Sequence, residues 1–200
     1  MATDEGRDVV RLDDAGFDAL LAAARGESDP SPQSTAVLAR PELAGPITAA
    51  LEPVVELSLV IADTGLRQVH RGWLNLESGL LLLAVRGDER QVLSCPPAFL
   101  ASMLARLVHL GPRKVGARGA QPLTDEAVSD LCGDNDVERQ AALAATDARY
   151  AWQLTASWEG GGRELIAVDG DDGLYVATDK GLEPTTASVV YRALTALLPA

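Results

Sequence analysis

The chain has 200 residues, of which 29 are acidic and 17 basic, so its net charge is −12; 47% of its residues are hydrophobic. This composition is typical of a folded globular protein and excludes a disordered one. Acidic residues outnumber basic ones both before and after Arg113, so neither half has the basic surface that nucleic acid or an anionic membrane requires.

The chain also lacks the sequence features of membrane insertion and export. Its strongest apolar run, Leu80 to Val85, is only as long as a strand and too short to span a bilayer. The segment from Met1 to Asp8 carries acids and lacks the basic start and apolar stretch of a signal peptide. We therefore expect a cytoplasmic protein without membrane insertion.

The N-terminal region predicts a strand, a helix and a loop. Residues 9–12 (Val-Val-Arg-Leu) are typical of a short strand, and the helix that follows over residues 13–21 has Asp13 as its expected N-cap. The Pro- and Ser-rich stretch from Glu27 to Ser34 is predicted to be a loop.

The middle region predicts three strands and a helix. An alternating apolar pattern predicts the first strand, and turn residues separate it from strands at residues 67–76 and 80–85. The helix is predicted to start at Pro96 and Pro97, because proline suits the first helical turn. The alternating strand residues are Val55, Leu57, Leu59 and Ile61, and the predicted apolar stripe of the helix is Phe99, Leu100, Met103, Leu104, Leu107 and Val108.

The C-terminal region repeats this layout after a Gly- and Pro-rich join at residues 111–121. A helix at residues 124–131 with Thr124 as its cap is followed by a second one at about 137–146, preceded by Asp134, Asn135 and Asp136. Strands are then expected at 152–158, 163–168 and 174–178, and a Pro-started helix after Glu183. The predicted inward residues are Trp152, Leu154, Ala156 and Trp158 on the first strand and Val189, Val190, Ala193, Leu194, Leu197 and Leu198 on the helix.

The two copies keep a constant spacing across their hairpins. Gly79 and Gly173 are 94 positions apart, and so are Gly87 and Gly181. We therefore predict an α+β fold of two duplicated β-β-β-α units, with antiparallel sheet covered by helices. Because three strands are near the lower limit of independent stability, residues 1–200 are expected to form one pseudo-symmetric domain, with half-repeats at 1–113 and 114–200.

Catalytic and metal chemistry have little support in the sequence. Cys95 and Cys132 are far apart and lack redox or metal-type spacing, and His70 and His109 are the only histidines. A thiol enzyme using Cys95 with His70 or His109 is kept only as a remote alternative. No enzyme, cofactor or metal site is predicted.

Two glycine-containing segments and one basic cluster are interpreted as structural. Residues 169–173 (Asp-Gly-Asp-Asp-Gly) lack the downstream Glu of a calcium loop and are typical of a hairpin turn. Gly160 to Gly162 are followed by no predicted helix, so they cannot form a phosphate cradle of the usual strand-loop-helix kind. The cluster of Arg113, Lys114 and Arg118 is interpreted as a solvated linker, while Trp158 and Tyr191 are possible partner-facing aromatics.

The sequence resembles the EspG family, which is associated with type VII (ESX) secretion in actinobacteria. The residues that carry the resemblance are 9–20, the strand at 55–59 with its hairpin, residues 173–176 and residues 183–186. An actinobacterial source is consistent with the use of Arg over Lys, since only two of the 17 basic residues are Lys. The chain is shorter than typical members and its hairpin turns are tight, so no binding residue carries over.

The resemblance implies a cytosolic, non-enzymatic chaperone that holds helical secretion substrates of the PE–PPE or WXG100-like type. An alternative from another class is a self-associating regulatory module, in which a free sheet edge pairs with a second copy to form a homodimer.

Overall fold

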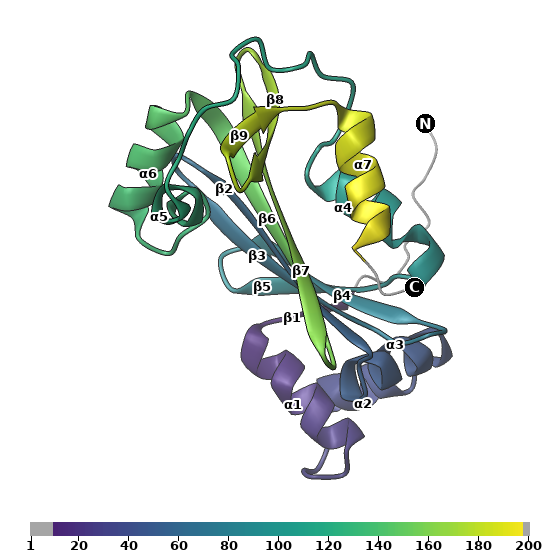
Figure 1. Ribbon diagram of the computed structural model, residues 1–200. Helices are drawn as coiled ribbons and strands as arrows, with labels where there is room; N and C mark the ends of the chain where they lie inside the picture. The colour runs from purple at the N-terminus through teal and green to yellow at the C-terminus, as the bar shows by residue number, and fades with distance from the viewer. Residues whose placement is uncertain (1–9, 198–200) are drawn as a thin grey trace, which may run out of the picture. The chain divides into compact units, whose positions relative to one another are not determined.

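The computed structural model describes residues 10–197, in which seven α-helices accompany nine strands of an antiparallel sheet (Figure 1). The strand order is β1-β5-β4-β3-β2-β6-β7-β8-β9. This confirms the predicted α+β class and the antiparallel sheet. Val9 and Leu198, which the sequence placed in a strand and in a helix, lie outside the described residues.

The described chain divides into two compact units. Unit 1 comprises residues 10–56 and 70–98, and unit 2 comprises residues 57–69 and 99–197. Unit 1 holds β1 (Val10–Leu12), α1 (Asp14–Ala24), α2 (Pro32–Leu38), α3 (Pro41–Leu51), β4 (Gly79–Arg86) and β5 (Glu89–Ser94). The strands β2 (Val55–Asp63) and β3 (Arg67–Leu74) have residues in both units.

Unit 1 is held together by an apolar core between its three helices and its strands. The core includes Phe17 and Leu20 of α1, Ile47 of α3 and Leu82 of β4. The Phe17 ring stacks on Trp73 with a centroid distance of 5.2 Å. Such aromatic pairs add to the stabilisation from burial alone.

The N-terminal helices partly differ from the prediction. Asp13 caps α1 as expected, since its carboxylate accepts a hydrogen bond of 2.6 Å from the Gly16 amide. The predicted loop, however, ends at Ser31, which caps α2, so residues 32–34 are helical. Pro32 and Pro41 each occupy the first turn of a helix, where proline loses no needed donor. Pro32, which suggested a loop, therefore marks a helix start, and neither α2 nor α3 was predicted.

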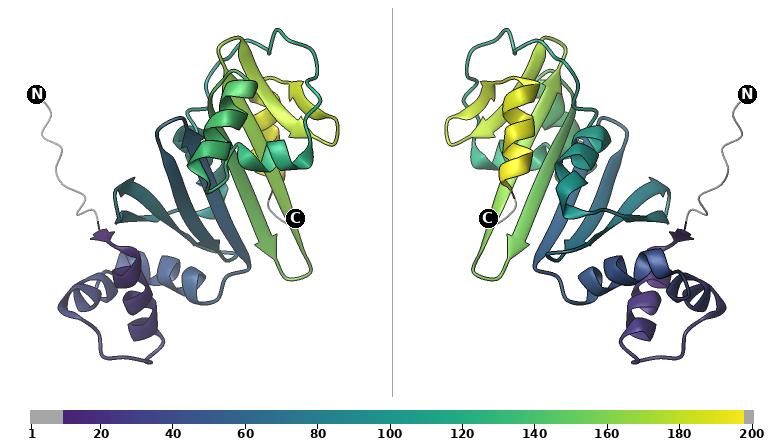
Figure 2. Two further views of the ribbon diagram at one scale, coloured as in Figure 1. Left: turned by 90° about the vertical axis from the view of Figure 1, so that its left-hand side faces the viewer. Right: turned by 90° about the vertical axis from the view of Figure 1, so that its right-hand side faces the viewer.

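Unit 2 is built on a long hairpin of β6 (Ala148–Trp158) and β7 (Gly161–Gly170), extended by β8 (Gly173–Thr178) and β9 (Gly181–Pro184). Figure 2 shows α5 (Asp125–Asp130) and α6 (Asp136–Ala145) on one side of this hairpin, and α4 (Leu100–Leu107) and α7 (Ala187–Ala196) on the other. A short 3-10 helix at Pro97–Phe99 precedes α4. Thr124 caps α5, as expected, and Asn135 caps α6.

Alternation along β6 and β7 gives the hairpin two buried faces. Trp152, Leu154 and Ala156 are buried on one face, as predicted. Ala151 pairs with Val168 on the opposite face, and both belong to an apolar cluster with residues of α6 and of the turn before it. Residues 150–156 of β6 are therefore all buried or half-buried.

Four expectations for the strands and helices were incomplete. The structure adds a fourth strand to each meander, β5 and β9, and β3 ends at Leu74 instead of residue 76. Pro184 ends β9, and Thr186 is the N-cap of α7. Phe99 is 62% exposed and Val189 43% exposed, so neither belongs to the buried stripe of its helix. The duplication and its boundary at residue 113 stay predictions.

The join at residues 111–121 lies against the β8–β9 hairpin. Leu174 donates its amide to the Lys114 carbonyl, and Gln121 exchanges backbone hydrogen bonds with Leu182. The approach is close: a Cβ on Gly116 would lie 2.1 Å from the Tyr175 ring, and one on Gly181 would lie 2.1 Å from the Gln121 carbonyl oxygen. Glycine is therefore required for this packing, and at Gly181 also for its φ of +105°.

Replacing Gly116 by Ala should destabilise the protein by about 1–3 kcal/mol, because the added methyl group forces Tyr175 or the join to move. Gly119→Ala is the matched control, since a Cβ there meets no atom within 4 Å; it should be neutral or slightly stabilising. Urea unfolding followed by circular dichroism measures both. Equal stability of the two variants would contradict the close packing.

Candidate functional site

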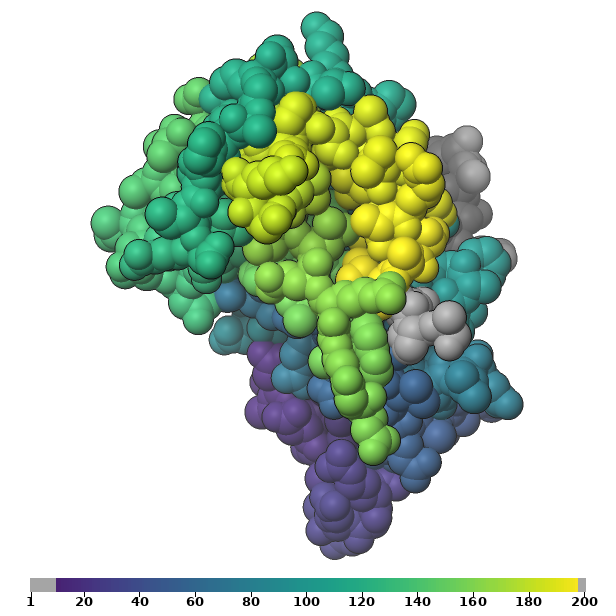
Figure 3. Space-filling view, in the orientation of Figure 1, coloured from purple at the N-terminus to yellow at the C-terminus, as the bar shows by residue number. Residues whose placement is uncertain are grey.

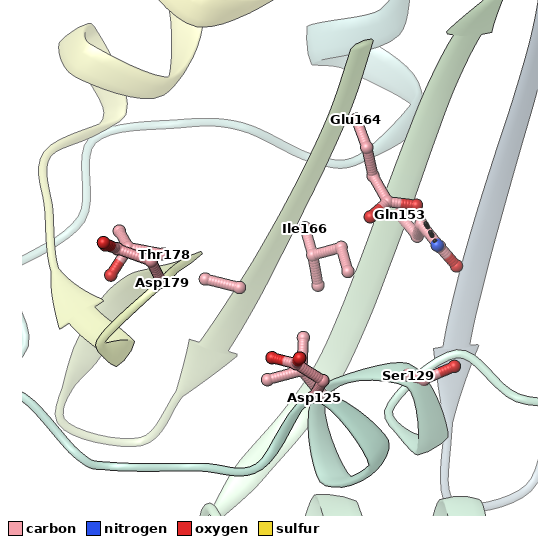
Figure 4. Close-up of a pocket in the computed structure, with 9 residues that line it drawn as sticks. Asp125, Ser129, Gln153, Glu164, Ile166, Thr178 and Asp179 are labelled. Atoms are coloured by element: carbon pink, nitrogen blue, oxygen red, sulfur yellow. Dashed lines mark hydrogen bonds between the residues drawn. The ribbon is translucent and has the colours of Figure 1, made fainter. Parts of the chain in front are cut away.

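A pocket of about 440 Å³ opens on unit 2, on the α5 side of the sheet (Figure 4). Its volume lies within the range of roughly 300–1,000 Å³ that is usual for ligand sites. The lining residues are Asp125, Val128, Ser129, Gln153, Glu164, Ile166, Ala177, Thr178 and Asp179. They come from α5, from the strands β6, β7 and β8, and from the turn that follows β8.

The floor of the pocket is a part of the sheet face that α5 leaves open. Gln153 and Ile166 are paired across β6 and β7, so their side chains share that face. Figure 4 shows Ile166 between the Gln153–Glu164 pair and the turn that carries Thr178 and Asp179. The floor therefore combines an apolar centre with polar groups on both sides.

The rim of the pocket is acidic. It includes the carboxylates of Asp125, Glu164 and Asp179, and none of the lining residues in the described structure is basic. Glu164 accepts a hydrogen bond of 2.6 Å from the Gln153 side-chain amide, which orients its carboxylate. Within the described residues, no hydrogen bond or ion pair reaches the carboxylates of Asp125 and Asp179. The pocket can therefore offer negative charge to a ligand.

A second polar cluster lies where β7 ends. Asp169 is 1% exposed, and its two carboxylate oxygens accept hydrogen bonds of 2.7 Å from Arg113 and from Arg149. A β-bulge explains the second contact: Tyr150 is paired with Asp169 and Ala148 with Gly170, so Arg149 is the extra residue. The predicted hairpin turn thus begins with a buried acid that is paired with two arginines.

The pKa values in this cluster follow from burial and charge. Burial raises the pKa of Asp169, but the hydrogen bonds from Arg113 and Arg149 and the positive charge of Arg113 outweigh it, so that the pKa lies below its ordinary 3.8. Burial, followed by the nearby Asp169, raises the pKa of Tyr150 to about 12. The Tyr150 hydroxyl also donates a hydrogen bond of 3.0 Å to the Val108 carbonyl.

Arg118 forms the other half of this network. Its guanidinium contacts Asp172 at 3.0 Å and Asp147 at 2.7 Å, and lies 5.8 Å from the Tyr175 ring centroid. The Tyr175 hydroxyl donates to Asp172 at 2.6 Å, and together these bonds hold the pKa of Asp172 well below its usual range. Arg113 and Arg118 therefore each form ion pairs with acids of the same chain. For these two residues, the interpretation as a solvated linker was wrong.

Asp169→Asn should lower the free energy of unfolding by about 1–3 kcal/mol at pH 7, because two arginines lose a charged acceptor; their partial exposure moderates the loss. The folded-state pKa of Asp169 is depressed, so its contribution is present above the unfolded pKa of 3.8 and is lost as the pH falls through the folded value. The difference from the native chain should thus be smaller at pH 3 than at pH 7. Urea unfolding at both values measures it.

Asp171→Asn is the matched control, since Asp171 is 84% exposed and 3.5 Å from Arg149. Its effect should stay within about 0.5 kcal/mol. An Asp169→Asn effect as small as this control would contradict the assigned role of the buried carboxylate.

The residues of the remote thiol-enzyme alternative are held in structural roles. Cys95 is fully buried, and burial raises the pKa of its thiol to about 11. His70 is also buried, its Nδ1 accepts a hydrogen bond from the Ala84 amide, and burial lowers its pKa to about 4. His109 is exposed and follows α4 with a φ of +48°. Because a nucleophilic cysteine must be accessible as a thiolate, this geometry favours a structural role for Cys95.

Both cysteines are free and buried, and burial also raises the pKa of Cys132 to about 12. Native protein at pH 8 should therefore react with Ellman's reagent far more slowly than protein in urea, which should expose both thiols. The absorbance of the released thiolate measures the reaction. Rapid modification of native Cys95, tested in a Cys132→Ala background, would revive the thiol-enzyme hypothesis.

The remaining candidates are structural or surface residues. Trp152 is 1% exposed and lies in the core, as predicted. Trp158 is half-buried near the hairpin tip, with Arg163 lying 5.9 Å from its ring centroid. Tyr191 of α7 is 39% exposed, and its hydroxyl lies 3.0 Å from that of Ser102. Figure 3 shows α7 next to the β8–β9 hairpin on the surface of unit 2.

Metal binding and membrane crossing were also tested against the described structure. In residues 10–197, no group of three or more His, Cys, Asp or Glu side chains is arranged to hold a metal ion. No helix of this described region is long and apolar enough to cross a bilayer.

Comparison with known proteins shows a likeness of fold. Among solved structures, the chain is similar to a chaperone of a type VII secretion system. That structure is the Mycobacterium tuberculosis chaperone EspG5 in complex with the PE25–PPE41 dimer, with a TM-score of 0.57 and 14% sequence identity, over 96% of this chain and 97% of that chain. No family model and no curated protein sequence matches the chain. At this identity, the likeness shows a shared fold.

Proposed function

We propose that this protein is an EspG-type chaperone or adaptor, which binds a helical substrate of a type VII secretion system in the cytoplasm and acts without catalysis. The observation that carries the proposal is the structural likeness to EspG5 over nearly the full length of both chains. That chaperone is bound to a PE25–PPE41 dimer in its structure, so a PE–PPE or WXG100-like protein is the first partner to test.

Two features of the chain support a binding role. The acidic rim of the unit 2 pocket faces solvent without an intramolecular cation in the described residues. The cysteine and the buried histidine that a thiol mechanism would use are instead held in structural positions. Neither feature names the partner, which the resemblance to the EspG family supplies.

Co-expression of the tagged chain with PE–PPE and WXG100-like pairs from its own genome should yield a soluble complex with one of them. The expected physical reason is burial of the partner's exposed apolar surface, as in stable protein interfaces. Size-exclusion chromatography with light scattering measures the mass of the complex, and a pair from an unrelated secretion cluster serves as the control.

Failure to form a complex with every pair from its own genome would overturn the proposed function. If the chain alone instead has twice its monomer mass at micromolar concentration, the self-associating module becomes the better hypothesis.

A further inference from the structure

The end of the join at residues 111–121 covers an edge of the sheet. β9 is the last strand in the sheet order, and its neighbour among the described strands is β8. On its other edge, Leu182 accepts a hydrogen bond of 2.8 Å from the Gln121 amide and donates one of 2.9 Å to the Gln121 carbonyl (Figure 1). A free strand edge can pair with another chain, and folded proteins commonly cover such edges with a loop.

The hydrogen bonds at this edge have the pattern of a strand pair. Leu182 exchanges both backbone bonds with Gln121, as two directly opposed residues of an antiparallel ladder do. Pro184 shares this edge, because alternate residues of a strand point their backbone groups the same way, and it has no N–H to offer. Leu182 is therefore the residue of β9 at which another strand would pair, and Gln121 occupies it.

The covering segment, residues 119–122, lies between two anchors and contains a free hinge. On one side Arg118 is fixed by two ion pairs, and on the other Leu123 packs against the apolar cluster of unit 2. Between them, a Cβ on Gly119 would meet no atom within 4 Å, so the backbone there can rotate without a clash. Residues 119–122 can therefore leave the edge while both anchors stay in place.

The Gln121 side chain opposes the closed position of this segment. Its Nε2 atom is buried and has no hydrogen-bond partner in the described part of the chain. A buried amide without a partner costs free energy, which is regained when the group reaches water. The backbone pair with Leu182 thus favours the closed position, whereas the unsatisfied side chain favours the open one.

We propose that residues 119–122 are a displaceable cover of the β9 edge, and that the uncovered edge pairs with β9 of a second copy. A second Leu182, related by a two-fold axis, presents the same donor and acceptor in the antiparallel direction, so it can replace Gln121. Because this edge offers only one such residue, the pairing is weak, and the closed cover keeps the native chain monomeric. This role is independent of the proposed secretion partner.

Hydrogen exchange of the ¹⁵N-labelled full chain tests the opening. The Leu182 amide, which is bonded to Gln121, should be less protected than the Leu174 amide, which is bonded to Lys114 in the same join. This order is expected because rotation at Gly119 leaves Lys114 in place. Equal protection of the two amides would overturn the local opening.

Variants of similar size at residue 121 should shift the opening in opposite directions. Gln121→Met removes the unpartnered amide, so exchange at Leu182 should slow by about five- to tenfold. Gln121→Glu buries a charge without a partner, so exchange at pH 7 should become at least about tenfold faster. Shifts of the same sign in the two variants would overturn the displaceable cover.

Ala120→Glu is the matched control, because it adds the same charge at the exposed neighbouring position. Exchange at Leu182 in this variant should stay within about twofold of the native rate. An acceleration as large as that of Gln121→Glu would show that charge alone, and not the buried site of residue 121, opens the segment, and would contradict the proposal.

Sedimentation equilibrium tests the second copy as the occupant, in about 0.3 M salt to screen the net charge of −12. The native chain, Gln121→Met and Ala120→Glu should be monomeric at about 100 µM, whereas Gln121→Glu should dimerise with a dissociation constant on the order of 100 µM. The Leu182 amide signal of that variant should shift with concentration.

A Gln121→Glu chain that opens at Leu182 but stays monomeric at about 1 mM overturns the pairing with a second copy. A dimer whose Leu182 signal does not shift with concentration has its contact elsewhere and overturns the pairing as well.

Discussion

The constraint on which unit 2 depends is the pairing of β6 with β7 along almost the whole length of both strands. Because successive side chains of a strand point to opposite faces, this hairpin supplies Trp152 and Leu154 to one buried face and Ala151 and Val168 to the other. Helices cover both faces, but α5 has only six residues. The part of the face that it leaves open, at Gln153 and Ile166, becomes the floor of the acidic pocket.

A second arrangement joins the middle of the chain to this hairpin. The segment at residues 111–121 packs against the β8–β9 hairpin through glycines, and in doing so places Arg113 on Asp169 and Arg118 on Asp172. The bulge at Arg149 adds a second arginine to the buried Asp169. Asp169 and Asp172 are thus paired with arginines of the same chain, whereas none of the residues that line the pocket is basic. The two acidic clusters therefore differ: one is paired within the chain, and the other has no ion pair in the described residues.

The likeness to EspG5 is one of fold and extends over nearly the whole of both chains. A shared fold at 14% identity does not transfer binding residues, so the partner surface has to be argued from this chain's own chemistry. The pocket beside α5 combines an apolar floor at Ile166 with the carboxylates of Asp125, Glu164 and Asp179. In unit 1, the stacked Phe17 and Trp73 rings and the buried thiol of Cys95 are explained by packing alone.

Local patterns in the sequence determined the fold class, most strands of both meanders, and the caps at Asp13 and Thr124, because alternation and capping depend on residues close together in the chain. They misjudged Pro32 and did not find α3, since a proline in the first turn of a helix and a proline in a loop look alike without tertiary contacts. Only the tertiary structure decided the partners of Arg113 and Arg118, which lie 56 and 54 positions from Asp169 and Asp172, and the pocket assembled from α5, β6, β7 and β8. Contacts between residues so distant in sequence are set by how the elements pack, and no local pattern records them.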